Sequence, residues 1–369
     1  MTTILKMNQG VRAAIKDFLR HLLETGAVHA VFTLRKQDSP NVVSYSLIAD
    51  PEKLDEATPF YPVMPGNAGG LLSRITLNES FKDPVAAVLR PCELRAFVEL
   101  VKRQQGNPAN IVTISSICAG VSPLKASAQW ESDQQVDEYW SAISNGELPP
   151  NIRDSCRICE HPVPMGADIV VPVAGEEEID SKCSFLLNSE KGAKLAEGMP
   201  GEIGETEQEV KEVEQIRSFR EKQRSELATE LEKTVAGLER VIETFASCTS
   251  CHGCRAVCPI CYCQLCEFDS SRSELKAQVV ETELRKRGGI RIPPGTLAFH
   301  IGRLAHMAIS CVGCGMCSDV CPAEIPVSSV FWKVGKAVQE LFDYTPGRSV
   351  EEAIPITVFE EDELCEVED

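Results

Sequence analysis

Two cysteine runs with the same spacing dominate the chemistry that this sequence can support. One run spans residues 248–259 and the other residues 311–322, and each ends in Cys-Pro. Their Cys-x2-Cys-x2-Cys-x3-Cys-Pro spacing is the one with which bacterial ferredoxins hold [4Fe–4S] clusters, where the fourth cysteine of each run binds the other run's cluster. The sequence therefore predicts two clusters with crossed ligands. The two ligand sets are Cys248, Cys251, Cys254 and Cys321, and Cys311, Cys314, Cys317 and Cys258.

The alternatives for these runs are a pair of zinc knuckles or a disulfide framework. Structural zinc sites usually combine two Cys-x2-Cys pairs, not three closely spaced cysteines with a distant fourth. Residues 1–20 lack the charged start and apolar core of a secretory signal. The 17 cysteines are therefore expected in a reducing, cytoplasmic compartment, where thiols bind metals and seldom form disulfides. The spacing and the expected compartment both favour clusters.

Four further cysteines could form a third set, made of Cys92, Cys118, Cys156 and Cys159. The first two each follow an apolar segment typical of a buried strand, and the last two form a Cys-x2-Cys pair. The ends of parallel strands meet at one edge of a sheet, where ligands bind. Four thiolates at that edge would suit a third [4Fe–4S] cluster. A structural zinc, or small buried side chains at the first two positions, are the alternatives that the spacing leaves open.

Three cysteines that follow the first run fit neither pattern. Cys261, Cys263 and Cys266 come directly after Cys258-Pro259. They could supply three ligands to a fourth cluster, but no fourth ligand stands at a recognisable spacing. We therefore favour packed or spare thiols beside the neighbouring cluster. Cys183 lies in a strand-like apolar segment and is expected in the core.

Two histidines flank a predicted helix just before the second run. His300 and His306 are six residues apart, so they do not share a helix face as an i, i+4 pair would. The default expectation is a structural role for both. The sharper alternative is a hydrogen bond to a cluster ligand, which would tune the reduction potential of the cluster.

Composition limits the class of protein. The chain has 369 residues, 43% of them hydrophobic, which is ordinary for a protein with a buried core and gives room for two or three domains. No apolar stretch approaches the roughly 18 residues of a membrane span. The formal net charge of −18 argues against binding to nucleic acid, because phosphate contacts need a basic surface. Acidic surfaces suit a basic partner, but they also serve simple solubility.

The first 204 residues are expected to form an α/β domain. Helical periodicity covers Val11–Leu23 and residues 93–103. Between and around these helices, apolar segments predict four strands, at Ala27–Leu34, Val42–Ile48, Val85–Leu89 and Ile111–Ile117. The alternation of strands and helices predicts a largely parallel sheet.

The remaining residues are expected to form a helical linker and a second domain. Residues 205–246 are rich in Glu, Lys, Gln and Ala and contain no proline, which predicts one or two long amphipathic helices that act as a spacer. Residues 247–369 are expected to form a two-cluster, bacterial ferredoxin-type α+β domain with an insertion between the runs. Helices are predicted at residues 274–287, 293–306 and 327–344.

Several motifs, taken in order, resemble the coenzyme F420 hydrogenase/dehydrogenase beta-subunit family. They are Arg90–Ala96, Ile117-Cys118, the Cys156–Cys159 pair with Ala167–Ile169, and Asn188–Gly192. The C-terminal half is most similar to the formate dehydrogenase beta-subunit branch of that family. The matching segments there are Cys258–Cys263, Phe299–His306, Cys311–Pro326 and Phe342–Gly347. The resemblance covers most of the chain, and the helical linker is its least diagnostic part.

The resemblance implies an α/β domain that binds FAD beside a proximal [4Fe–4S] cluster, which strengthens the cluster interpretation of the third cysteine set. No Gly-x-Gly-x-x-Gly fingerprint follows a strand, so an ordinary Rossmann site is not predicted. The expected flavin contacts are Arg90 and the glycine-containing segment Asn67, Ala68, Gly69 and Gly70, whose alternative is a plain surface turn. The family's commoner Gly-Thr-Pro-Cys-Gln motif is replaced by Leu89–Glu93, which leaves open whether F420 or another carrier is used.

The function expected from these features is that of an iron–sulfur flavoprotein subunit. FAD would exchange electron pairs with F420 or another soluble carrier, and the clusters would pass single electrons to a partner. The resemblance implies a catalytic subunit of a formate dehydrogenase or hydrogenase as that partner, or a heterodisulfide-reductase-like complex. The alternative is a flavin-free iron–sulfur adaptor that connects two redox enzymes. No catalytic acid, base or nucleophile is assigned, because the chemistry would belong to the cofactors.

Overall fold

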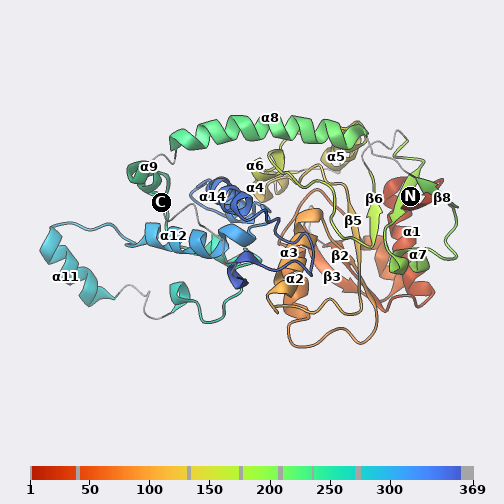
Figure 1. The fold of residues 1–369 in the computed structure, drawn as a ribbon, viewed down its shortest axis with the longest axis horizontal. Coiled ribbons are helices and arrows are strands. Elements are labelled where there is room, and N and C mark those ends of the chain that lie inside the picture. The colour runs from red at the N-terminus through yellow and green to blue at the C-terminus, as the bar shows by residue number, and fades with distance from the viewer. Residues whose placement is uncertain are drawn as a thin grey trace.

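The computed structural model describes residues 2–38, 42–130, 134–173, 178–206, 211–234, 237–270 and 276–358. Two units lie side by side and one long helix, α8, runs along both (Figure 1). The C-terminal end of the predicted second domain, residues 359–369, lies outside the described residues. In the part of the chain that the structure describes, no helix combines the length and apolarity needed to cross a bilayer.

The first unit is built on an eight-stranded mixed sheet with the strand order β3-β2-β4-β5-β6-β7-β1-β8. The strands are β1 Thr2–Met7, β2 Ala30–Lys36, β3 Val43–Ile48, β4 Val85–Val88, β5 Ile111–Ser116, β6 Ile169–Val171, β7 Cys183–Leu187 and β8 Glu202–Thr206. Only the β2-β4-β5-β6 block is parallel, and the other pairs are antiparallel. The expectation of a largely parallel sheet was therefore wrong.

The correction has a clear physical reason. Strand β3 follows β2 by a short connection and pairs with it as an antiparallel hairpin. At the other end, β1 inserts between β7 and β8, so the beginning of the chain pairs with residues 183–206. Strand β8 also places the predicted boundary at residue 204 inside a strand of the sheet. Such pairing between distant segments leaves no local signal in the sequence.

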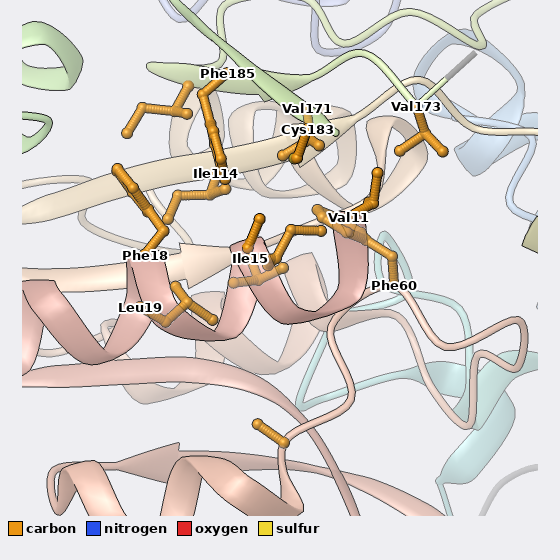
Figure 2. Close-up of a cluster of buried hydrophobic side chains, with 14 of the residues drawn as sticks. Val11, Ile15, Phe18, Leu19, Phe60, Ile114, Val171, Val173, Cys183 and Phe185 are labelled. Carbon is orange, nitrogen blue, oxygen red and sulfur yellow. The ribbon is translucent and has the colours of Figure 1, made fainter. Parts of the chain in front are cut away.

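One face of the sheet is covered by α1 (Val11–Glu24) and α5 (Gln134–Ser144). The predicted periodicity of α1 is confirmed, because Val11, Ile15 and Phe18 are all buried against the strands (Figure 2). The ring of Phe18 stacks on that of Phe185 with centroids 4.8 Å apart. Cys183 is 1% exposed and belongs to this core, as expected.

The other face is covered by α2 (Ala68–Ile75) and α3 (Pro91–Lys102). Smaller elements complete the unit. They are η1 (Pro51–Glu56), α4 (Leu124–Ser127), α6 (Asp154–Arg157) and α7 (Glu190–Leu195).

The predicted helical linker consists of α8 (Lys211–Thr234) and α9 (Gly237–Thr244). Helix α8 is mostly solvated, but Ile216, Arg220 and Leu231 are buried. Its side chains contact the first unit near α6, and Glu232 pairs with Lys333 of the second unit at 3.1 Å. The segment therefore packs against both units, whereas a plain spacer would touch neither.

The second unit wraps its cysteine runs in short helices and loops. Its elements are α10 (Gly253–Ala256), η2 (Glu267–Asp269), α11 (Ala277–Arg287), α12 (Thr296–Met307), η3 (Ala308–Ser310), α13 (Met316–Asp319), α14 (Val327–Leu341) and η4 (Pro355–Thr357). Between residue 247 and residue 358, no strand occurs among the residues that are described. The expected α+β character is thus wrong there. Helix α11 stands away from the body of the molecule (Figure 1) and has no buried residue.

A buried carboxylate joins the two units. Glu99 of α3 accepts hydrogen bonds from the Ser310 hydroxyl at 2.5 Å, the Tyr344 hydroxyl at 2.6 Å and the Gly347 backbone N–H at 3.1 Å. One turn earlier, Arg95 donates to the Pro346 carbonyl at 2.8 Å. These charge-assisted bonds fix α3 against the residue that precedes the second cysteine run and against residues 344–347.

Candidate functional site

The first predicted ligand set comes together around Cys254. Burial raises the pKa of this thiol, and the charges of Cys248, Cys251 and Cys321 raise it further, because these three are its neighbours. Cys321 belongs to the other run, so its position beside Cys254 agrees with the crossed arrangement. Cys251 is exposed, which brings this set to the surface of the molecule.

Two polar side chains of α12 contact this set. Arg303 is 2% exposed and donates to the Sγ of Cys254 at 3.2 Å and to the carbonyl of the same residue at 3.1 Å. His300 Nε2 lies 3.3 Å from the Sγ of Cys248. This contact agrees with the alternative expectation that His300 forms a hydrogen bond to a cluster ligand. His306 is exposed. Arg303 was not anticipated from the sequence, where it is the one arginine of α12 and belongs to no motif with the cysteine runs.

The second predicted set lies deeper. Burial raises the pKa of Cys317 well above its usual value, and the neighbouring thiols of Cys314 and Cys311 raise it further. Cys258 packs against the same hydrophobic cluster as Cys311 and Cys317, and Cys248 and Cys321 of the first set pack there too. Cys254 also contributes to the pKa of Cys317, so the two sets are electrostatic neighbours. The structure thus brings both ferredoxin-type sets together inside one unit.

The third predicted set surrounds one small cavity with an open space of about 400 Å³. All four of its cysteines line the cavity. Cys92 begins α3, Cys118 follows β5, Cys156 lies in α6, and Cys159 follows α6. This is the carboxyl edge of the parallel block, where the strand ends were expected to meet. Residues of the second unit, Gly313 and Cys314, line the same cavity.

Burial and cations act in opposite directions on these thiols. Burial raises the pKa of Cys118 to about 11, while Arg220 and Arg90 lower it. Burial likewise raises the pKa of Cys156, and Arg153 is the main group that opposes the rise. Metal ligation requires the deprotonated thiolate. Buried thiols ringed by arginines are therefore suited to hold a metal cluster, whose binding would displace the protons.

No group of three or more His, Cys, Asp or Glu side chains in the described ranges is arranged to hold a single metal ion. A [4Fe–4S] cubane needs a different arrangement of ligands. Each of its four irons binds one thiolate, so the four ligands surround the cluster and do not converge on one point. The four cysteines around the cavity have that general disposition.

The residues expected to contact a flavin have packing or capping roles in this structure. Asn67 caps α2 by accepting from the Gly70 backbone N–H at 3.1 Å. A Cβ on Gly69 would lie 2.7 Å from the Phe97 nitrogen, so glycine there allows α2 and α3 to approach closely. A Cβ on Gly70 would lie 3.0 Å from Pro259. Ala68 and Gly69 are buried, so the segment is not a surface turn.

The side chain of Arg90 also bonds to other groups of the protein. Its guanidinium donates to the carbonyls of Tyr61 and Val63 and pairs with Glu93 at 3.5 Å, and it is 3% exposed. It lines the cavity of the third set. The side chain of Asn67 similarly lies beside Cys314, where it lowers the pKa of a thiol that burial raises to about 11. Both residues are thus placed toward cysteines.

The three remaining cysteines all lie near Arg255, close to the first run. Cys261 lies next to Cys258, and its thiol contacts Met307 Sδ at 3.4 Å. Cys263 is exposed, and its carbonyl accepts from Arg255 at 3.0 Å. Cys266 also neighbours Arg255. Cys261 thus packs against the hydrophobic cluster of the second unit, whereas Cys263 is exposed.

A second, wider cavity lies in the first unit. It lies between α1, α5 and residues 55–61, and its open space is about 930 Å³. Its walls carry both charges and aromatic rings: the cations Arg12, Lys16 and Lys36, the acids Asp55 and Glu56, and the rings of Tyr61 and Trp140. One contact joins residues of the two cavities. Arg90, which lines the smaller cavity, donates to the carbonyl of Tyr61, which lines the wider one.

Comparisons with known proteins find a matching iron–sulfur domain and relatives over most of the chain. The 4Fe-4S dicluster domain family matches residues 243–325. The F420-dependent formate dehydrogenase subunit beta of Methanocaldococcus jannaschii is 26% identical over 93% of both chains. The F420-dependent formate dehydrogenase 1 subunit beta of Methanococcus maripaludis is 28% identical over 90% of both chains. The resemblance drawn from the motifs is confirmed by these relatives.

One solved structure shows a weaker likeness. It belongs to the F420-reducing [NiFe] hydrogenase complex from Methanosarcina barkeri. The match has a TM-score of 0.45 and 14% identity, and it covers 62% of this chain and 92% of that one.

Proposed function

We propose that this chain, which is similar over most of its length to beta subunits of F420-dependent formate dehydrogenases, is the electron-transfer subunit of an oxidoreductase complex. It would carry three [4Fe–4S] clusters, two on the ferredoxin-type sets and one on the third set. One observation carries the proposal: Cys314 of the second set lines the same cavity as all four cysteines of the third set.

The contacts between the sets support a linear relay. The third set adjoins the second set through that shared cavity, and Cys159 and Cys311 line a further cavity together. The second set adjoins the first through Cys317 and Cys254. The first set reaches the surface at the exposed Cys251. Electrons would thus enter or leave the chain at one end near the sheet and at the other end near Cys251.

The end of the relay near the sheet requires a group that carries two electrons at a time. The relatives are named as F420-dependent, and exchange of a hydride with such a carrier needs a two-electron group before one-electron clusters can take over. FAD supplies that chemistry when bound. We place it in the wide cavity between α1 and α5, where Lys16, Lys36 and Arg12 suit phosphates and Tyr61 and Trp140 suit a ring system, although Asp55 and Glu56 also line this cavity. The residues first expected to bind it, Asn67–Gly70 and Arg90, are not part of this proposal, because they are packed.

The other end of the relay, at Cys251, would contact a partner protein. The relatives' names support a catalytic subunit of a formate dehydrogenase, and a hydrogenase or a heterodisulfide-reductase-like complex are partners of the same kind. The exposed Cys251 and the adjacent His252 lie where a partner's own cluster could approach.

A flavin-free adaptor is the second candidate, and the packed state of the expected flavin contacts favours it. The two candidate functions can be distinguished with the anaerobically purified chain. The main proposal predicts about one releasable FAD per chain with flavin absorption and fluorescence, and loss of that FAD in the double variant Lys16→Glu, Lys36→Glu. If iron is present and the wild-type chain binds no flavin after reconstitution with FAD, the adaptor is correct.

The third cluster is tested by iron content. The double variant Cys92→Ala, Cys159→Ala should contain about four iron atoms fewer than the wild-type chain, the content of one cubane. A Cys183→Ala variant is the matched control, because that thiol lies in the core away from the sets. Equal iron in the double variant and in the wild type would refute the third cluster.

A further inference from the structure

Helix α8 forms part of the wall around the third set. It runs along the molecule past α5, α6 and α14 (Figure 1). Among its described side chains in the first half of the helix, two are anchored in the interior: Ile216 is 0% exposed and Arg220 is 1% exposed. Helix α8 carries mostly Glu, Lys, Gln and Arg, so a buried arginine on its inner face calls for an explanation.

Arg220 reaches into the cavity of the third set. One of its terminal nitrogens donates to the carbonyl of Cys118 at 3.1 Å, and the side chain lines the cavity together with the four cysteines. Its Nε and its other terminal nitrogen are buried and have no hydrogen-bond partner among the described residues. A buried guanidinium with unused donors is costly unless an anion faces it.

A second arginine of α8 holds the other side of the same set. Arg224, one turn further on, donates to the carbonyls of Ile158 at 3.3 Å and Cys159 at 3.5 Å. It also lies 3.9 Å from the carboxylate of Glu160. Helix α8 thereby fixes the backbone at two of the four cysteines, which come from different parts of the chain.

We propose that Arg220 is a positioning residue for a cluster on the third set, so that α8 belongs to the cluster site. The inference rests on the proposed third cluster. A cubane with four thiolate ligands is an anion in both oxidation states, and its reduced form carries one more negative charge. The two free donors of Arg220 would face that charge and favour the reduced form. The bond to the Cys118 carbonyl would hold one ligand in place.

The test compares Arg220→Met with Arg217→Met in the purified, iron-loaded full chain. Arg217 lies on the same helix, is 51% exposed and pairs only with Glu214 among the interactions described for it. Removal of the Arg220 charge should lower the potential of the third cluster. In EPR-monitored redox titrations, we expect its reduced-to-oxidised ratio at a fixed potential to fall at least about tenfold, which is 59 mV for a one-electron couple. Arg217→Met should change neither this ratio nor the iron content.

Arg220→Gln provides the same test if the methionine variant does not fold, because glutamine can still donate to the Cys118 carbonyl but lacks the charge. A third-cluster potential within experimental error of the Arg217→Met value in these variants would overturn the inference. That result is distinct from failure of the proposed function. If Cys92→Ala, Cys159→Ala retains all its iron, there is no third cluster and both proposals fall. If that variant loses about four irons and the Arg220 variants are unchanged, only the role of Arg220 is wrong.

Discussion

The guanidinium of Arg303 donates a 3.2 Å hydrogen bond to the Sγ of Cys254, from a helix 49 residues further along the chain. The same side chain lies over the rings of Phe331 and Phe299, at 5.0 Å and 5.6 Å from their centroids. The cation is therefore held between aromatic rings and directed at a predicted cluster ligand. Hydrogen bonds to ligand sulfurs are one of the means by which a protein sets a cluster potential.

Replacement of Arg303 by methionine should lower the potential of the cluster on the first set by roughly 50 mV or more, because the reduced cluster loses a nearby positive charge. Redox titration followed by EPR measures this directly. Arg285→Met is the control, since Arg285 is 84% exposed on α11. A first-set potential that is the same in both variants would contradict the prediction.

Replacement of Gly69 by alanine tests why glycine stands in the segment first expected to bind flavin. The added Cβ would overlap the backbone of α3, so the free energy of unfolding should fall by about 1–3 kcal/mol or more. Gly66→Ala is matched to it, because a Cβ there meets nothing within 4 Å. Chemical denaturation followed by circular dichroism gives the comparison. A stable Gly69→Ala variant that has lost only its flavin would instead restore the original prediction for this segment.

Replacement of Glu99 by leucine should weaken the junction of the two units. The variant leaves Ser310, Tyr344 and the Gly347 N–H without their buried acceptor, at a cost of about 3–5 kcal/mol. We expect earlier thermal unfolding and faster proteolysis between the units than in Glu239→Leu, whose parent side chain is exposed on α9. Identical melting of the two variants would show that Glu99 does not hold the units together.

Local patterns in the sequence predicted much of the fold. Apolar residues at a helical spacing located α1, α3 and α14, and short apolar segments located β2, β4 and β5. The pairing of β1 with β7 and β8 could not be predicted, because strands almost 200 residues apart meet there and nothing in either strand specifies its partner. The mixed character of the sheet follows from these non-local pairs.

The same distinction applies to the site. Cysteine spacing is local, so both runs and their crossed partners could be proposed from the sequence. Arg220 and Arg303 could not, because each acts on a cysteine 102 or 49 residues away. The one available signal for Arg220 is its position four residues after Ile216, which continues an otherwise interrupted inner face of α8.

The crossed ligation can be tested by a comparison of Cys321→Ala with Cys263→Ala. Cys321 neighbours Cys254 in the first set although it belongs to the second run. Its removal should therefore impair the cluster whose other ligands are Cys248, Cys251 and Cys254, lower the iron content by up to about four atoms, and leave the second-set signal in EPR. Cys263 is exposed and belongs to none of the three sets, so its removal should leave the iron content unchanged. Loss of the second-set signal in Cys321→Ala would show that each run binds its own cluster, and loss of iron in Cys263→Ala would give the spare cysteines a cluster of their own.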